Sequence, residues 1–379
     1  MKTAGIVCEF NPFHYGHKYL IETVKKEFDA VVCVMSGSFV QRGEAALYDK
    51  WTRCEAALLN GADLVIELPV RFSLSSAKGF SMGSISLLAQ PGIVDSVCFG
   101  CECCDTDELI KTSEILSCEP PEVSEKIKEL MARGQNYPKA RAEAFKGLVN
   151  PDIISQPNNI LALEYISAVK NLNTSMKVYP IKRYAVDHDS PQANGNFASA
   201  SFLRDAVKNG RDISAYTPYD FTRCTRYDTD KLTPIFKYKL ISMRDKIFDN
   251  IPDAEPGLAE HFFKAINEPT LSDIIESVKT KRYTYTRLRR VALSAVLNIH
   301  GGYKNPEYLR ILGMNDTGKA LLSDMRKKAS LPLVNKTADF KSPMFNEDIY
   351  ATNIAALCSD RQVLQNSDYF NSPIIINNN

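Results

Sequence analysis

Four short apolar runs in the first hundred residues constrain the fold more than any other feature of this chain. They are TAGIVCEF from Thr3, DAVVCVMSG from Asp29, ADLVIELP from Ala62 and DSVCFG from Asp95, and they begin about 30 residues apart. Segments with helical periodicity separate them. Runs that are apolar on both faces and joined by helices are what a parallel sheet covered on both sides requires. We therefore expect an α/β fold with a parallel sheet.

The rest of the chain shows helical patterns with one further strand. Residues 105–175 have helical periodicity, and the strand-like run KVYPIKRYAV follows at Lys177. From about residue 199 the pattern is helical, with breaks at YTPYD and GGYKNPEY. We therefore predict a sheet domain over residues 1–210, with a helical excursion at about 105–175, and a mainly α-helical domain over 211–379.

Composition limits how this chain could bind nucleic acid. Its residues are 44% hydrophobic, which is enough for a substantial core, and 46 Lys plus Arg stand against 45 Asp plus Glu. Because the charge is nearly balanced, attraction to phosphates has to come from a local cluster of cations. The segment KTKRYTYTRLRR, from Lys279, is such a cluster and contains two tyrosines. Cations meet phosphates and aromatic rings stack on unpaired bases, but a solvated basic helix has the same pattern.

The sequence also bears on location and metal content. The first residues do not combine a basic start, an apolar stretch and a small-residue cleavage site, and no apolar run approaches the roughly 20 residues that span a bilayer. We expect a cytoplasmic protein with no membrane association. Cys101, Cys103 and Cys104 lie close together, but no second pair with zinc-ligand spacing follows and Cys118 stands alone, so we predict no metal site.

The loop after the first strand carries the strongest chemical signal. In EFNPFHYGHKYL, His14 and His17 flank Gly16 just where a strand gives way to a helix. The first N–H groups of a helix and its dipole favour an anion, and ligands of parallel sheets bind beyond the carboxyl ends of the strands. An ordinary turn with two solvated imidazoles is the alternative. The position at the end of the first strand favours a phosphate site, with Gly16 allowing close approach to the backbone.

Two motifs resemble a known superfamily. HYGH is similar to the signature of the adenylyl-transferring enzymes that include class I aminoacyl-tRNA synthetases, and SASFLRDAV from Ser199 is similar to their S-S-T-x-I-R element. The longer pattern EFNPFHYGH, MSGSFVQRGEAA, GADLVIELP, FGCE and QPNNILALEY resembles the bacterial tRNA(Met) cytidine acetate ligase family over nearly the whole chain. Tyr15, Cys101, Phe202 and Leu203 depart from the usual residues of that family.

The resemblance implies a fold and a reaction. The fold is a Rossmann-like nucleotidyltransferase domain of the HIGH superfamily with a parallel sheet, followed by a helical domain that binds tRNA. The reaction uses ATP, with Mg²⁺ on its phosphates, to activate acetate as acetyl-adenylate. The acetyl group then passes to the wobble cytidine of elongator tRNA(Met), giving N4-acetylcytidine. No protein partner is implied.

The resemblance also assigns residues. Catalytic roles fall on His14, His17, Arg183, Ser201 and Arg204. Nucleotide binding falls on Val7, Cys8, Glu9, Phe10, Asn11, Pro12, Phe13, His14, Gly16, His17, Leu20, Gly100, Asn158 and Arg183. Contacts with tRNA fall on Lys279, Lys281, Arg282, Arg287, Arg289 and Arg290. The N-cap of the following helix is the alternative role for Asn158. Because Asn159 provides a second amide beside it, one residue can cap the helix while the other binds the nucleotide.

Two further sets of polar residues stand near strand ends. Ser36, Gln41 and Arg42 belong to a long loop after the second strand, and we expect one of them to shape the acetate or cytidine pocket. Asp63 and Glu67 lie in an otherwise apolar strand, where a buried carboxylate needs a partner. A structural pair with Lys50 or Arg53 is favoured over a general base.

Two other functions share part of this pattern. A small-metabolite adenylyltransferase or a ligase similar to pantothenate synthetase would use the same two histidines, but it leaves the basic helical half unexplained. An RNA-binding module on an inactive scaffold would lack the histidines or the S-x-S-x-x-R element, and both are present.

Overall fold

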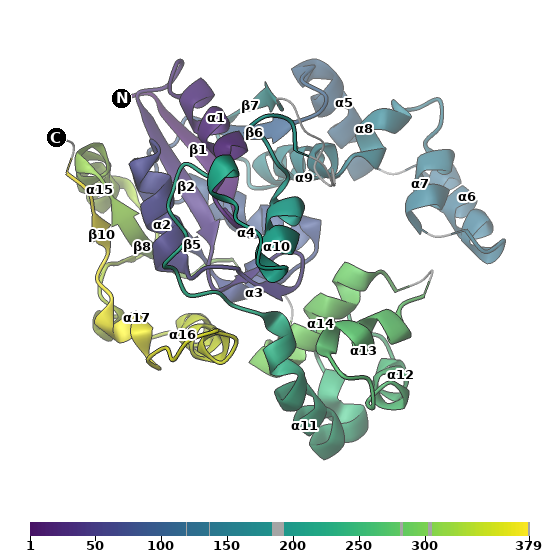
Figure 1. Cartoon of the computed structure of the whole chain (residues 1–379). Coiled ribbons are helices and arrows are strands. Elements are labelled where there is room, and N and C mark those ends of the chain that lie inside the picture. The colour runs from purple at the N-terminus through teal and green to yellow at the C-terminus, as the bar shows by residue number, and fades with distance from the viewer. Residues whose placement is uncertain (119, 136, 184–192, 281–282, 302–304, 378–379) are drawn as a thin grey trace.

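The computed structural model describes residues 1–118, 120–135, 137–183, 193–280, 283–301 and 305–377. Five parallel strands form the centre of its main sheet (Figure 1), in the order β5-β2-β1-β6-β7. They are β1 (Thr3–Cys8), β2 (Ala30–Ser36), β5 (Leu64–Leu68), β6 (Ser96–Cys101) and β7 (Lys177–Lys182). The predicted parallel α/β sheet is therefore confirmed.

Alternate residues of β2 explain why both faces of the sheet are covered. Val32 and Val34 pack in one core, and Val31 and Cys33 pack in a second core on the opposite face. Successive side chains of a strand point to opposite faces, so a strand that is apolar throughout needs helices on both. The first core includes residues of α4 (Ala77–Ala89), α9 (Pro157–Asn171) and α15 (Asp316–Lys328), and the second those of α1 (Tyr15–Val24), α2 (Lys50–Leu59) and α10 (Ala200–Lys208).

The sheet extends past β5 with strands from the second half of the chain. β8 (Leu309–Met314) runs antiparallel to β5, and β9 (Leu333–Val334) and β10 (Ile374–Ile375) run parallel to β8. The sequence pattern predicted that this region belongs to the helical half, so β8 is a difference from the prediction. All six of its residues are buried. Because Arg310 is the single charged residue of LRILGM, the run has no regular alternation that would separate a strand from a buried helical segment.

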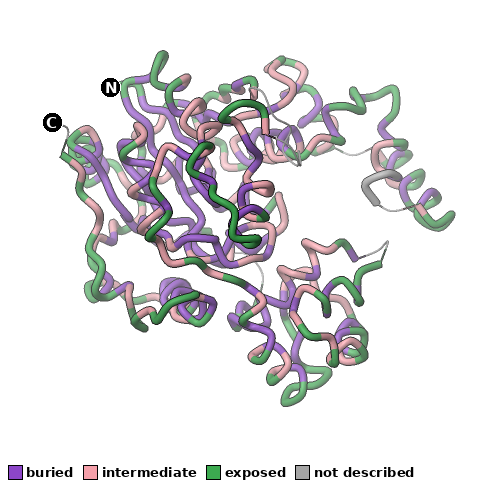
Figure 2. The backbone as a smooth tube through the Cα atoms, viewed as in Figure 1, coloured by how far each residue is buried: buried purple, intermediate pink, exposed green. Residues whose placement is uncertain are grey.

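Two groups of helices lie beside the sheet (Figure 1). The predicted helical excursion contains α5 (Thr106–Ser117), α6 (Pro121–Ala132), α7 (Tyr137–Ala144), α8 (Pro151–Ser155) and α9. The second group is α11 (Thr233–Met243), α12 (Leu258–Lys264), α13 (Leu271–Val278) and α14 (Tyr285–Leu297), and it has a core of its own. Figure 2 shows buried residues along the strands and exposed residues on the outer helices.

Short elements connect these parts. The hairpin of β3 (Phe39–Val40) and β4 (Glu44–Ala45) follows β2, and α14 packs against β4. The loop after β5 leads through α3 (Val70–Ser73) to α4, and α3 contacts α16 (Pro343–Ala356), which α17 (Ser367–Phe370) follows. Within the described residues, no helix is long and apolar enough to span a membrane.

Candidate functional site

A cavity of about 220 Å³ lies at the carboxyl ends of β1, β6 and β7. After β5 the chain crosses back and places β6 on the free side of β1, so the strand order reverses between β1 and β6. A reversal of this kind opens a crevice beyond the strand ends, which is the usual ligand position in such sheets. The predicted loop, from the end of β1 into α1, forms one side of this cavity.

The two histidines lie against each other at the start of α1. His14 is the N-cap residue, and its Nδ1 accepts a hydrogen bond from the Gly16 N–H at 3.0 Å. The Nδ1 of His17 accepts from the His14 N–H at 3.3 Å, and the two rings stack with centroids 3.7 Å apart. Because each Nδ1 accepts, Nε2 carries the proton in both neutral rings. Both residues line the cavity and can act there as hydrogen-bond donors.

Gly16 is needed for a reason that the sequence did not reveal. A Cβ at this position would lie 2.8 Å from Cε1 and 2.9 Å from Nδ1 of His14. A side chain there would displace the imidazole that caps the helix. The glycine therefore serves the position of His14 as well as access to the backbone.

The side of the cavity formed by β6, α4 and α9 is apolar. It consists of Phe80, Phe99, Leu161 and Tyr165, and the Phe99 and Tyr165 rings lie with centroids 5.7 Å apart. Gly100 lies beside them. A Cβ added at Gly100 would lie 3.4 Å from Cγ of Arg183, so the glycine leaves room for the arginine side chain. An apolar wall with a few polar groups suits a flat ring such as a nucleobase.

Asn158 and Asn159 fasten the loop after β6 to the start of α9. The Asn158 amide donates to Glu102, and Asn159 accepts from the N–H groups of Glu102 and Cys103 at 3.0 Å each. The N-cap of α9 is Gln156, so neither asparagine has the alternative role that the sequence left open. Asn158 lines the cavity, and Asn159 is almost fully buried.

The S-x-S-x-x-R element begins α10. Ser199 is its N-cap and accepts from the Phe202 N–H at 3.1 Å, and the Ser199 and Ser201 hydroxyls lie 3.0 Å apart. Arg204 reaches across to donate to the Asn11 carbonyl at 2.9 Å, and its Nε pairs with Glu44 at 2.9 Å. Arg204 thereby joins α10 to the loop after β1 and to the β3–β4 hairpin.

Most of the predicted site residues gather around the cavity. Those that line it are Val7, Cys8, Glu9, Phe10, Asn11, His14, Gly16, His17, Leu20, Gly100, Asn158, Arg183 and Arg204. Pro12, Phe13 and Ser201 do not line it, and Phe13 is a core residue. Sequence reasoning missed Tyr19, Lys182 and the apolar wall, because Phe80 and Tyr165 lie in helices whose apolar faces read simply as core.

The charge around the cavity is unequal. Arg42, Lys182, Arg183 and Arg204 line it, and Glu9 is the single carboxylate among the described residues that do so. Glu9 accepts from the Gln41 N–H at 2.7 Å and from the Ser36 hydroxyl at 3.4 Å. Burial raises the pKa of Glu9 above its ordinary value, against the effect of the Gln41 hydrogen bond and of Arg204. The excess of cations indicates an anionic ligand.

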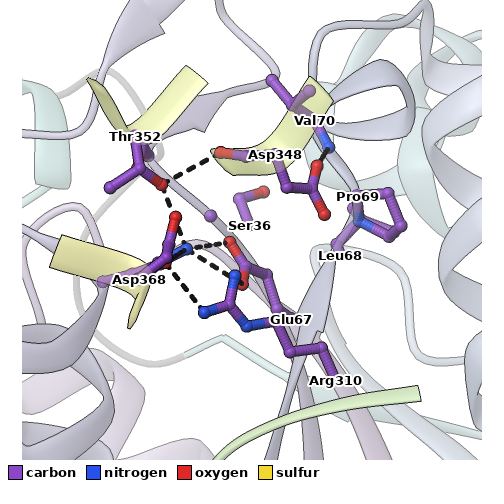
Figure 3. Close-up of polar contacts among 12 residues, drawn as sticks. Ser36, Glu67, Leu68, Pro69, Val70, Arg310, Asp348, Thr352 and Asp368 are labelled. Atoms are coloured by element: carbon purple, nitrogen blue, oxygen red, sulfur yellow. Dashed lines mark hydrogen bonds and ion pairs between the residues drawn. The ribbon is translucent and has the colours of Figure 1, made fainter. Parts of the chain in front are cut away.

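Another group of charged side chains, which includes Glu67, Arg310 and Asp368, lies near the end of β5 (Figure 3). Lys50 donates to both oxygens of Glu67 at 2.8 and 3.0 Å and pairs with Asp368 at 2.7 Å. Arg310 of β8 pairs with Glu67 at 3.1 Å and with Asp368 at 2.8 Å. All four are at most 3% exposed. We call these four residues the buried ion cluster.

Asp348 adjoins the buried ion cluster but carries a different charge. Its carboxyl group accepts from the Val70 N–H at 2.7 Å and from the Tyr308 hydroxyl. Burial, and next the charge of Glu67, raise the pKa of Asp348 to about 8, so near neutral pH this group is mostly protonated. Burial also acts to raise the pKa of Asp368, but Lys50 and Arg310 lower it below its ordinary value. The cluster therefore holds two positive and two negative charges.

Ion pairs also show the role of Glu67, in β5, and of Asp63, which directly precedes β5. The structure pairs Glu67 with Lys50, as predicted. Asp63 instead pairs with Lys25 at 2.9 Å and accepts from the Val31 N–H at 2.7 Å, so its predicted partner was wrong. Arg53 donates to the carbonyl oxygens of Glu9, Ser36, Gly37 and Tyr48 and so holds the ends of β1 and β2 together. Neither carboxylate lines the cavity.

The basic segment is more strongly paired than its sequence indicated. Arg287 pairs with Glu255 at 2.7 Å, Arg290 with Asp253 at 3.7 Å, and Arg289 with Glu44 at 3.2 Å. The side chains of Arg289 and Arg290 are only 16% and 11% exposed. Lys279 is exposed and pairs with Glu276. Lys281 and Arg282 lie outside the described residues.

Cys101, Cys103 and Cys104 lie after β6 without a metal-binding arrangement in the described part of the chain. The Cys101 and Cys104 sulfur atoms are 3.8 Å apart, and burial raises the pKa of the Cys101 thiol. Across the described residues, no three His, Cys, Asp or Glu side chains gather in a way that could hold a metal ion.

Comparison with known proteins adds to this geometry. A family model described as HIGH Nucleotidyl Transferase matches residues 1–369. A tRNA(Met) cytidine acetate ligase of Clostridium perfringens is 37% identical over 402 aligned residues, which cover 99% of this chain and all of that protein. An enzyme of the same name from Clostridium novyi is 35% identical over 401 aligned residues, with the same coverage.

Solved structures give a similar result. The crystal structure of Thermotoga maritima TmcAL bound with alpha-thio ATP superposes with a TM-score of 0.88 at 30% identity, covering both chains completely. The apo form of the same protein gives a TM-score of 0.89. The similarity therefore extends over both the sheet and the helices beside it.

Proposed function

This chain belongs to the tRNA(Met) cytidine acetate ligase family of HIGH nucleotidyltransferases, and we propose that it activates acetate with ATP and acetylates the wobble cytidine of elongator tRNA(Met). The observation that carries the proposal is the cation-rich cavity at the reversal of strand order, with two histidines at the start of α1. We place its action in the cytoplasm, where its tRNA substrate is found.

The first half-reaction needs stabilisation of negative charge. An acetate oxygen attacks the α-phosphorus of ATP, and pyrophosphate leaves with the electrons of the broken P–O bond. His14 and His17 present Nε2–H groups to the phosphate oxygens, and the dipole of α1 adds positive potential at the start of the helix. Arg183 and Arg204 supply positive charge on the β7 and α10 sides. Adenine lies against the apolar wall, next to Gly100.

Magnesium belongs to this proposal as a companion of ATP. Mg²⁺ prefers oxygen ligands and is often held by one or two carboxylates together with substrate phosphates. The cavity offers few carboxylates, so the phosphate oxygens would supply most of its ligands. The metal would neutralise charge on the departing pyrophosphate.

The second half-reaction brings tRNA to the same cavity. The exocyclic amine of cytidine takes the acetyl group and AMP leaves. We place the tRNA along the basic segment, with Lys279, Lys281 and Arg282 meeting phosphates. Arg287, Arg289 and Arg290 are already paired with carboxylates and would contribute less to phosphate binding.

Nucleoside analysis tests the proposal. Elongator tRNA(Met) is incubated with the protein, ATP, magnesium and labelled acetate, and its nucleosides are then separated by mass. Labelled N4-acetylcytidine is expected, and it should disappear when ATP is omitted or when the wobble cytidine is replaced by uridine. Acetate-dependent ATP–pyrophosphate exchange without any labelled nucleoside would contradict the proposed tRNA substrate and favour a small-metabolite acyl-adenylate ligase.

A further inference from the structure

Glu9 lines the cavity, and the proposed activation of acetate gives it no part in the chemistry beyond the nucleotide contact that the family resemblance implies. It directly follows β1, which is the strand between β2 and β6. It is also the single carboxylate among the described residues that line the cavity, against four Lys and Arg. Glu9 is only partly buried, and its carboxyl group lowers the positive charge that the cavity offers to an anionic ligand, so its presence there calls for a role of its own.

The hydrogen bonds of Glu9 place its carboxylate on one side of the cavity. Its Oε1 accepts from the Gln41 N–H at 2.7 Å and from the hydroxyl of Ser36, the last residue of β2, at 3.4 Å. Gly100 and Asn158, next to the apolar wall, lie on the opposite side with β6 and α9. His14 and His17 enter from α1. A nucleotide with its base at the apolar wall and its α-phosphate at the histidines would direct the acetyl group toward Glu9.

The same side of the cavity leads toward the basic segment. Gly43, which closes the β3–β4 hairpin beyond Gln41, packs so closely on α14 that a Cβ there would lie 2.7 Å from Cβ of Arg289. Glu44 of this hairpin pairs with both Arg204 and Arg289. A nucleotide of a tRNA bound along α13 and α14 would therefore reach the cavity past this hairpin, next to Glu9.

Resting on the proposed function, we infer that Glu9 is the catalytic residue that accepts a hydrogen bond, and then the proton, from the exocyclic amine of the target cytidine. Carboxylates are the side chains that accept from this amine in nucleic-acid recognition. In the step itself a bond forms between the amine nitrogen and the acetyl carbon. The bond from that carbon to the AMP oxygen breaks, AMP leaves with its electron pair, and one amine proton moves to Glu9.

The surroundings of Glu9 suit a base that works near neutral pH. Burial raises the pKa of Glu9, which brings it closer to the pH at which a general base is most effective. The charged and titratable groups that act on it come from several elements: Arg42 and Glu44 from the hairpin, Arg204 from α10, Arg53 from α2, Cys8 from β1 and Tyr165 from α9. His14 and His17 line the same cavity. The backbone hydrogen bond from Gln41 opposes the effect of burial without removing it.

Single-turnover acetylation tests the inference without the first half-reaction. The whole protein is mixed with synthetic acetyl-adenylate and elongator tRNA(Met), and acetylcytidine is followed from pH 4 to pH 8. With the native protein the rate should rise with pH through the pKa of Glu9, above the ordinary value of about 4.3. Glu9→Gln should lower the rate by about a hundredfold or more and remove this rise.

A neighbouring carboxylate provides the matched control. Glu44→Gln removes the same charge from the same region but leaves the proposed base in place, so the rise of rate with pH should remain. Glu9→Asp keeps a carboxylate with a shorter reach and should restore part of both the rate and the rise. If Glu9→Gln keeps the native pH profile, Glu9 is not the base and only positions Gln41. If the native protein itself forms no acetylcytidine, the proposed function fails instead.

Discussion

The cavity and the buried ion cluster lie at the same edge of one sheet and differ in their charge balance. The cavity has four cationic side chains and one carboxyl group with a raised pKa. The buried ion cluster has two cations and two anions, each with partners at 2.7 to 3.1 Å. Both contain Lys or Arg near strand ends, and composition alone does not separate them.

The difference separates charged groups that line a cavity from charged groups that are enclosed by one another. Burying an ion is costly unless a partner compensates it, and in the cluster each ion has one. In the cavity the cations outnumber the carboxylates, and an incoming polyphosphate would supply the missing negative charge. The sequence favoured a structural pair over a general base for Glu67 and Asp63, and the ion pairs of both residues agree with that role.

The largest effect is expected from removing one partner from the buried ion cluster. Lys50→Met should lower the free energy of unfolding by about 3–5 kcal/mol, because Glu67 and Asp368 lose a buried partner. Urea unfolding measures the loss. Lys264→Met is the matched control, because Lys264 pairs with Glu260 on the surface, where both side chains are 69% exposed. This substitution should lower the free energy of unfolding by less than about 1 kcal/mol. Equal losses in the two variants would mean that the cluster does not stabilise the fold.

The next largest effect is expected from replacing a histidine that lines the cavity. His14→Asn and His14→Ala should each slow acetate-dependent ATP–pyrophosphate exchange by about 10²–10³-fold, the cost of removing one positioned donor to a developing charge. Asparagine can still cap α1, whereas alanine should also cost about 1 kcal/mol of stability. Exchange assays and urea unfolding on both variants separate the two roles. His261→Ala on α12 is the control, and exchange within tenfold of native in His14→Asn would remove the phosphate role.

A pH series sharpens the contrast between Asp348 and its charged neighbours. The folded-state pKa of Asp348 is raised to about 8, so the folded protein holds a proton that the unfolded chain has released above about pH 4. Stability from this group is complete below about pH 4 and is lost as pH rises toward 8, by at most about 1.4 kcal/mol per pH unit. Asp348→Asn should flatten this part of the curve of unfolding free energy against pH. An unchanged slope would mean that Asp348 is ionised in the folded state.

The smallest effect concerns the basic segment. Lys279→Ala should make the slope of the logarithm of the tRNA-binding constant against the logarithm of salt concentration shallower by roughly one unit, because one phosphate contact is lost. Arg287→Ala should leave the salt dependence nearly unchanged and lower the melting temperature, because Arg287 already binds Glu255 and the Asp253 carbonyl. Filter binding across a salt series, together with thermal unfolding, measures both. A larger salt effect for Arg287→Ala would place the tRNA directly on α14.

The sequence predicted those parts of the fold that depend on local pattern. Apolar β-branched runs gave the five parallel strands, and the glycine between two histidines marked the start of α1. It did not predict β8, because LRILGM is buried on both faces and has no alternation to read. It also did not reveal that Arg287 pairs with Glu255 and Arg290 with Asp253, because these partners lie more than 30 residues away in sequence.

The functional site was also predicted where it depends on local pattern and missed where it depends on three-dimensional contacts. The strand-end loop located the histidines, since a motif, a strand end and a helix start coincide there. Phe80 and Tyr165 could not be found, because each belongs to a helix whose apolar residues serve two surfaces at once. The dependence of His14 on Gly16 needs three-dimensional contact distances, which no residue pattern contains.

The buried ion cluster also sets the order in which a newly made chain can complete its core. Lys50 donates to Thr352, which lies 302 positions later in the chain. A ribosome adds about 5–20 residues per second, so roughly 15–60 s separate the synthesis of the two. Until β8 has been made, β5 has no strand on that side and presents an open edge to other chains. Synthesis of this protein therefore includes a period when this edge is open to aggregation, and the buried ion cluster is completed later still, when Asp368 has left the ribosome.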